Sequence, residues 1–253
     1  MTERSLNNTA ETEKSIAERC AEFDRNYADV MNRIAAAAVK SGRRPEDICL
    51  LAATKTIPVE VINHAIAGGV TLIGENRVQE LCSKYDDYDK SAERHLIGHL
   101  QTNKVRKVIG KVSMIESVDS LHLAKEISRC SEEQGIVTEI LVEVNIGGEQ
   151  SKSGVMPSET EELLSDISCF SGIKVKGLMT IPPICDEKEK NCAYFAQMYN
   201  LFVDISRKKI DNIDMRYLSM GMSNDFEDAI LNGANIVRVG TRLFGSRFYP
   251  NRA

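Results

Sequence analysis

The chain has 253 residues, of which 42% are hydrophobic and 27% are charged, with 16 glycines and 6 prolines. This composition is that of an ordinary globular protein, and it excludes a disordered or collagen-like chain. The formal net charge of −5 argues against a nucleic-acid partner, because nucleic-acid-binding proteins carry a clustered basic surface.

The seven cysteines are scattered along the chain and form no C-x-x-C pair. This usage is typical of compartments in which thiols stay reduced. No apolar run approaches the ~20 residues of a membrane span, and the first residues lack the apolar core of a secretion signal. We therefore expect a cytoplasmic protein without a membrane partner.

A long helix is predicted near the start of the chain. Apolar residues recur there at alternating steps of four and three, which marks one face of a helix. They are Ile16, Cys20, Phe23, Tyr27, Val30, Ile34 and Ala37. Gly42 and Pro45 mark its end. We expect a helix of roughly 30 residues, within a helical segment 1–45, that packs on the rest of the domain. A dimerising coiled coil is the alternative.

Eight short apolar runs follow, each separated from the next by a turn and a stretch with helical patterning. The runs are Ile48–Thr54, Thr71–Gly74, Leu96–Gly98, Met114–Val118, Ile140–Asn145, Val175–Thr180, Tyr217–Met220 and Ile236–Gly240. Strictly alternating strands and helices imply parallel pairing. Eight such units predict an α/β fold, a single (β/α)₈ TIM-type barrel spanning residues 1–253. An open, doubly wound sheet has the same alternation and remains the alternative.

In such a barrel the active site lies where the strands end, and phosphate sites are typical after strands seven and eight. Gly221, Met222 and Ser223 follow the seventh run, and Gly240 and Thr241 follow the eighth. Glycine permits close approach of a ligand to the backbone, and hydroxyl groups bind anions. These residues predict an anion cradle, although Ser223 or Asn224 could instead simply cap the next helix.

Lys55 follows the almost wholly apolar first strand. Partial burial there would lower the pKa of its amine and make it a nucleophile toward an aldehyde; a solvated surface charge is the alternative. His95 and His99 are four residues apart in an extended segment, hence ~13 Å apart and too distant to share a metal. We therefore predict no metal site.

The chain resembles the pyridoxal phosphate homeostasis family over nearly its whole length after the first helix. The matching segments are LLAATKTIP, LIGENRVQE, HLIGHLQTNKVR, ESVDS, VNIGGEQSKSG, KGLMTIPP, LSMGMSNDFEDAI and VRVGTRLFG. In GENRVQE the chain departs from the pattern at Arg77, where many relatives have an aromatic residue.

The resemblance implies a fold like the N-terminal barrel of alanine racemase, with pyridoxal 5'-phosphate held by Lys55 as an internal aldimine. It further implies that Ser223, Gly240 and Thr241 contact the phosphate, with Met222 in the same loop. Asn76 would lie beside the cofactor, and Arg238 would face the pyridine nitrogen.

The resemblance also implies a protein that buffers pyridoxal phosphate and supplies it to apo-enzymes in vitamin B6 homeostasis, with little or no catalysis. An amino-acid racemase or related enzyme is the alternative, because the freed Lys55 amine could remove an α-proton. Alanine racemases take the second catalytic group from an added domain of a partner subunit, for which this chain leaves no room after the eighth strand. A sugar-phosphate isomerase on the same barrel is a third hypothesis, and we expect a monomer.

Overall fold

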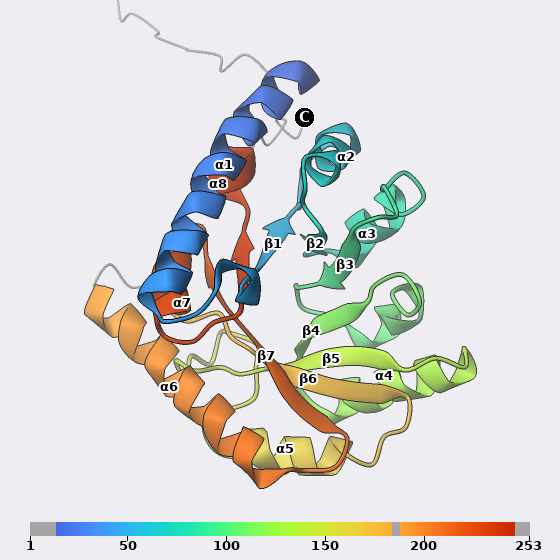
Figure 1. Ribbon diagram of the computed structural model, residues 1–253. Coiled ribbons are helices and arrows are strands. Elements are labelled where there is room, and N and C mark those ends of the chain that lie inside the picture. The colour runs from blue at the N-terminus through green and yellow to red at the C-terminus, as the bar shows by residue number, and fades with distance from the viewer. Residues whose placement is uncertain (1–13, 184–187, 246–253) are drawn as a thin grey trace, which may run out of the picture.

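The computed structural model describes residues 14–183 and 188–245. Eight parallel strands form a closed barrel in chain order, with the last strand paired to the first (Figure 1). The strands are β1 (Cys49–Ala53), β2 (Leu72–Glu75), β3 (Glu93–Leu96), β4 (Met114–Val118), β5 (Thr138–Glu143), β6 (Ile173–Met179), β7 (Ile213–Met222) and β8 (Ile236–Val239). The predicted α/β barrel is thus confirmed, and the open sheet is excluded.

Helices surround the barrel and bury its outer face. They are α1 (Ile16–Lys40), α2 (Val59–Ala67), α3 (Val78–Lys84), α4 (Leu121–Glu133), α5 (Thr160–Ile167), α6 (Lys188–Lys208), α7 (Phe226–Leu231) and α8 (Thr241–Phe244). Short 3₁₀ turns add η1 (Pro45–Asp47), η2 (Thr102–Lys107) and η3 (Pro157–Glu159). The connection from β3 to β4 holds η2 in place of the expected α-helix. No helix in the described part of the chain is long and apolar enough to cross a membrane.

Four strands begin earlier than the apolar runs predict: β5 and β6 by two residues, β3 by three and β7 by four. β3 runs from Glu93 to Leu96 instead of from Leu96 onward, and Glu93 pairs with Leu72 of β2. β7 begins at Ile213, where exposed Asp214 and Arg216 alternate with less exposed neighbours. Each of these strands carries charged side chains at its N-terminal end, so hydrophobicity marks only its inner part.

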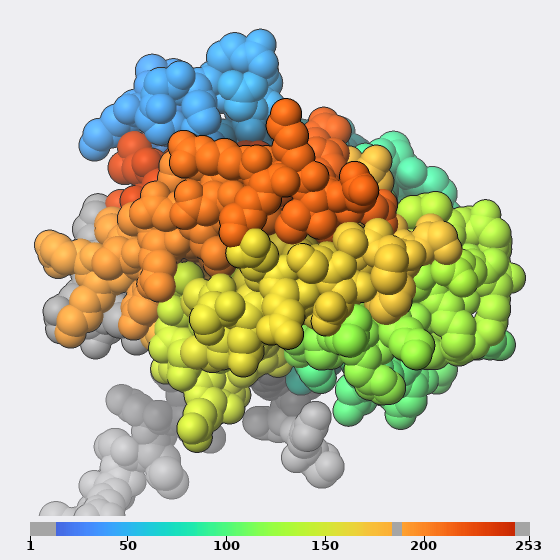
Figure 2. Space-filling model, turned by 90° about the horizontal axis from the view of Figure 1, so that it is seen from below, coloured from blue at the N-terminus to red at the C-terminus, as the bar shows by residue number. Residues whose placement is uncertain are grey.

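α1 packs its apolar stripe on the barrel. Ser15 caps the helix by a reciprocal pair of hydrogen bonds with Glu18, and the helix has 25 residues, against the roughly 30 predicted. Phe23 is fully buried and stacks on the rings of Tyr27 and Phe244. α1 contacts α2, α7 and α8, so that the N-terminal helix lies beside the C-terminal helices (Figures 1 and 2). The part of the predicted segment 1–45 that precedes residue 14 lies outside the described residues.

The docking of α1 predicts a large cost for shortening its central side chain. Phe23→Ala is expected to lower the free energy of unfolding by about 3–5 kcal/mol, because it removes a fully buried ring and leaves a cavity. Val39→Ala, at a position that is 66% exposed on the same helix, should change it by less than about 0.5 kcal/mol. Urea unfolding of both variants measures the difference, and equal effects would mean that α1 adds little to stability.

Candidate functional site

A cavity of about 1010 Å³ opens at the carboxyl ends of the strands. The residues predicted for the site come from the ends of β1, β2, β7 and β8, or from the loops that follow these strands. All of them line this cavity: Lys55, Asn76, Met222, Ser223, Arg238, Gly240 and Thr241. The barrel thus brings together residues from opposite ends of the chain.

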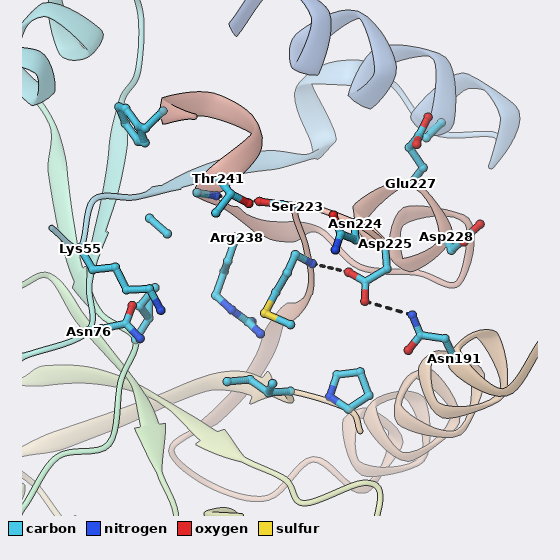
Figure 3. A pocket seen from close by; sticks show the side chains of 18 of the residues that line it. Lys55, Asn76, Asn191, Ser223, Asn224, Asp225, Glu227, Asp228, Arg238 and Thr241 are labelled. Atoms are coloured by element: carbon cyan, nitrogen blue, oxygen red, sulfur yellow. Dashed lines mark hydrogen bonds between the residues drawn. The ribbon is translucent and has the colours of Figure 1, made fainter. Parts of the chain in front are cut away.

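Lys55 lies on the turn that follows β1, and its side chain extends toward Asn76 (Figure 3). The next residue, Thr56, has a φ of +64°, a left-handed conformation that is uncommon for a branched side chain and costs about 1–3 kcal/mol. Glu80 of α3 accepts a hydrogen bond from the Thr56 N–H. Lys84, one turn further along α3, donates to Glu80 and to the Thr54 carbonyl. The start and end of α3 therefore hold the turn that carries Lys55.

A buried carboxyl lies behind this turn. Glu75 at the end of β2 is 1% exposed, and its Oε1 accepts hydrogen bonds from Thr54 Oγ1 and Tyr88 Oη, each at 2.8 Å. Burial raises the pKa of Glu75, although the nearby Lys84 ammonium lowers it. Sequence reasoning missed this cluster; the only signal for it is the Glu80–Lys84 spacing of four on a helix.

Asn76 offers the cavity an unused acceptor. Among the residues that the structure describes, its buried Oδ1 atom has no hydrogen-bond partner. A buried polar atom without a partner is uncommon in native proteins and costs free energy. Its position beside Lys55 (Figure 3) suits a ligand that brings a hydroxyl group next to the lysine amine.

Ser223 ties the loops after β7 and β8 together. Its Oγ accepts hydrogen bonds from the backbone N–H groups of Gly240 (3.1 Å) and Arg242 (3.3 Å). The expectation that Ser223 or Asn224 caps the next helix is wrong, because Asp225 occupies the N-cap of α7. Ser223 is drawn instead toward β8, where the barrel closes.

The loop after β7 is held by Asp225. Its carboxylate accepts hydrogen bonds from the Met222 N–H (2.6 Å) and from Asn191 Nδ2 (3.0 Å), as Figure 3 shows. Gly221 has a φ of +91°, and a Cβ added there would lie 2.5 Å from the Cβ of Ala229. Only glycine fits this turn, which aims Met222 and Ser223 at the cavity.

Arg238 supplies a buried cation in the cavity wall. It is 4% exposed, and its guanidinium donates hydrogen bonds to Ser219 Oγ (2.6 Å) and to the Thr180 carbonyl (2.8 Å). Burial lowers the pKa of Arg238, but the carboxylates of Glu116, Glu143 and Asp225 raise it. Because a guanidinium is so strongly basic, the side chain stays charged.

The site therefore presents the Lys55 amine, the Arg238 cation and the hydroxyl groups of Ser223 and Thr241 to one cavity (Figure 3). This set suits a ligand that joins an electrophilic carbon to an anionic group. The two histidines make separate contacts: His95 contacts Glu116 inside the barrel, and His99 lies 3.5 Å from Asp119 at its rim. Among the described residues, no cluster of three or more His, Cys, Asp or Glu side chains could hold a metal ion.

Glu143 at the end of β5 is a titratable group that sequence reasoning missed. Burial, together with the charge of Asp119, raises its pKa to about 7, although Arg238 lowers it. Nothing in the apolar run around Glu143 signals this shift, because it depends on burial and on Asp119 and Arg238, which are distant in the sequence.

This pKa predicts a pH-dependent stability. Between pH 4.5, the ordinary pKa, and pH 7, the folded protein binds more protons than the unfolded chain, so stability falls as the pH rises, by about 3 kcal/mol in all. Glu143→Gln resembles the protonated acid and should escape this loss. Urea unfolding of both proteins at pH 4.5 and pH 8 tests this; a difference between them that does not change with pH would contradict it.

Comparison with known proteins agrees with this fold. Residues 22–248 match the family described as alanine racemase, N-terminal domain. The pyridoxal phosphate homeostasis protein of Aquifex aeolicus is 45% identical over 221 residues, which are 87% of this chain and 96% of the relative.

Two solved structures show the same architecture. An unknown protein from Bifidobacterium adolescentis has a TM-score of 0.87 and 38% identity, and the match covers 92% of this chain and 98% of that one. PipY of Synechococcus elongatus PCC7942, solved with pyridoxal phosphate bound, has a TM-score of 0.74 and 31% identity, over 91% of this chain and 100% of PipY. The chain therefore belongs to the pyridoxal phosphate homeostasis protein family, built on the barrel of the alanine racemase N-terminal domain.

Proposed function

We propose that this chain binds pyridoxal 5'-phosphate as a Schiff base with Lys55, and that it buffers and supplies this cofactor in vitamin B6 homeostasis. The observation that carries the proposal is the convergence of Lys55, Ser223 and Thr241 on one cavity of about 1010 Å³. Membership of the pyridoxal phosphate homeostasis protein family supports pyridoxal phosphate as the ligand. When bound, the cofactor supplies an aldehyde for the lysine amine and a phosphate for the opposite side of the site.

Each of the seven predicted site residues has a role in this proposal. Asn76, whose buried acceptor has no partner among the described residues, would accept a hydrogen bond from the ring hydroxyl. Gly240 and Thr241 would bind the phosphate together with Ser223, and Met222 would line the same wall. Phosphate binding fits these loops because backbone N–H and hydroxyl groups converge there.

Arg238 is the residue that we assign to the ring nitrogen, and this assignment explains why we propose little or no catalysis. A permanent cation beside the nitrogen discourages its protonation, and an unprotonated ring is a weaker electron sink for carbanion chemistry. The buried carboxylates that favour the charged guanidinium strengthen this effect. The cofactor would be bound tightly but kept unreactive.

We infer that the protein works as a cytoplasmic monomer that passes the cofactor to apo-enzymes. Free thiols at Cys20, Cys49, Cys82, Cys130 and Cys169 support a reducing compartment. The apolar stripe of α1 packs on the barrel, which leaves little of it for a coiled-coil partner.

The proposal predicts a yellow protein whose colour depends on Lys55. Incubation with pyridoxal phosphate should give a visible band, and borohydride reduction followed by peptide mass mapping should place the adduct on Lys55. Lys55→Ala should lose the band and the adduct. Lys40→Ala is the matched control, because Lys40 lines the same cavity. A colourless wild-type protein without an adduct would contradict the proposal. The cavity would then serve another phosphate ester, such as a sugar phosphate.

The proposed lack of catalysis is tested separately. In heavy water, the loaded protein should exchange the α-proton of several amino acids no faster than Lys55→Ala does, as followed by NMR. Rapid exchange that depends on Lys55 would instead favour the amino-acid racemase alternative, because it would show proton removal by the freed amine.

A further inference from the structure

Four buried polar side chains form a continuous hydrogen-bonded chain through the barrel interior. The Arg238 guanidinium donates to Ser219 Oγ (2.6 Å), and Ser219 Oγ donates to Glu116 Oε2 (2.6 Å). The other carboxylate oxygen of Glu116 lies 2.7 Å from His95 Nδ1. None of the four residues is more than 4% exposed. They come from β8, β7, β4 and β3, so only the closed barrel brings them together.

This chain spans the barrel from end to end. Arg238 lines the large cavity at the carboxyl ends of the strands. His95 lines a second cavity, of about 330 Å³, at the amino ends of the strands, together with Glu93, Glu139 and Tyr217. The proposed cofactor site and the opposite end of the barrel are thus joined by three short hydrogen bonds.

The direction of the hydrogen bonds follows from the charge on Glu116. Full burial raises the pKa of this carboxyl, but the hydrogen bond and charge of His95, the charge of Arg238 and the Ser219 hydroxyl outweigh burial and hold the pKa below its ordinary value. An ionised carboxylate only accepts hydrogen bonds. Ser219 must therefore donate to Glu116, which leaves the hydroxyl lone pairs for Arg238, and His95 must carry its proton on Nδ1.

The same arrangement compensates for buried charge. The Glu116 carboxylate lies 3.9 Å from the Arg238 guanidinium, and an unpaired buried charge of either sign would be costly. Glu143 on β5 and Asp225 after β7 also favour the charged guanidinium, but neither makes a hydrogen bond to it in the described structure. Apart from Ser219, the Thr180 carbonyl is the acceptor that Arg238 reaches. Two acceptors thus orient the guanidinium: the Thr180 carbonyl and Ser219, which is itself held by Glu116.

We propose that Ser219 and Glu116 are positioning residues that fix Arg238 against the cofactor ring, and that His95 completes this network from the opposite end of the barrel. The proposal rests on the proposed function for the identity of the ligand. It adds three residues, on strands β3, β4 and β7, that line no part of the cofactor cavity. Their role is to keep one cation in one place.

The positioning is first measured without any ligand. In the apo-protein, a fixed guanidinium should give separate Nη–H signals by NMR, assigned by their loss in Arg238→Lys. Ser219→Ala and Glu116→Gln should merge or lose these signals. Ser117→Ala is the matched control, because Ser117 is equally buried on β4 but donates to the Gly98 carbonyl, and it should leave them unchanged.

The effect on the ligand is measured with pyridoxal phosphate and with its 1-deaza analogue, which has a C–H in place of the ring nitrogen. Ser219→Ala and Glu116→Gln should weaken binding of pyridoxal phosphate by about tenfold and alter the visible circular dichroism of the bound cofactor. The same variants should weaken binding of the analogue much less, because the contact at the nitrogen is already gone. A merely structural role would weaken both ligands equally.

His95 is tested by a conservative pair. His95→Leu removes the donor to Glu116 and should reproduce the changes seen in Ser219→Ala, whereas His95→Gln keeps a donor and should restore most of the wild-type spectrum. The outcomes separate the two proposals. If wild-type protein binds no pyridoxal phosphate but shows the fixed Arg238 signals, the proposed function fails and the positioning network stands. If the cofactor binds but Ser219→Ala and Glu116→Gln behave like Ser117→Ala, the positioning network is overturned.

Discussion

The pairing of β1 with β8 is the contact on which the site depends. Leu51 pairs with Arg238 and Ala52 with Val239, and this register closes the barrel. It brings the turn that carries Lys55 next to the loop that carries Gly240 and Thr241, although most of the chain lies between them. Parallel strands send all their carboxyl ends to one side, so the amine and the proposed phosphate groups meet there. Without closure, Lys55 and Thr241 would lie at opposite edges of an open sheet.

Closure also creates an interior that is unusual in its polarity. TIM-type barrels are filled mostly by branched apolar side chains, yet here Arg238, Glu116, Ser219 and His95 occupy part of that space. Burying these groups is tolerable only because each has a partner with a short hydrogen bond. These polar side chains take the place of apolar packing in the barrel, and they hold a cation at a defined place in the cavity wall.

A second polar cluster supports the opposite side of the site. Thr56 adopts a strained backbone, and Glu80 and Lys84 of α3 hold it there. Both clusters support the site indirectly, through residues that line it, because neither Glu116 nor Glu80 lines the cavity. They support the two groups that would contact the cofactor in the proposed function, the Lys55 amine and the Arg238 cation. The proposed function needs such rigidity, because a poorly placed amine or cation would weaken binding of the cofactor.

The sequence by itself determined the class of fold, the number of strands and seven of the residues that line the cavity. Alternation of apolar runs and helical stretches is a local property, and strand ends such as Lys55 and Gly240 can be read directly from it. It placed the starts of β3 and β7 too late, because charged residues such as Glu93 and Asp214 form those ends. It also left capping of the next helix open as an alternative for Ser223, since the partners of Ser223, Gly240 and Arg242, lie after β8 and not in its own loop.

Only the tertiary structure decided the choice between a closed barrel and an open sheet, because both have the same local pattern. It also decided which buried polar groups meet. Glu116 lies in a β-strand pattern that looks wholly ordinary, and Ser219 and His95 are far from it in the sequence. The hydrogen bond from Ser219 to Glu116 crosses the barrel interior between β7 and β4, and the pKa of Glu143 is raised by burial and by Asp119, which follows the neighbouring strand β4. Such contacts depend on register and closure, which no single segment encodes.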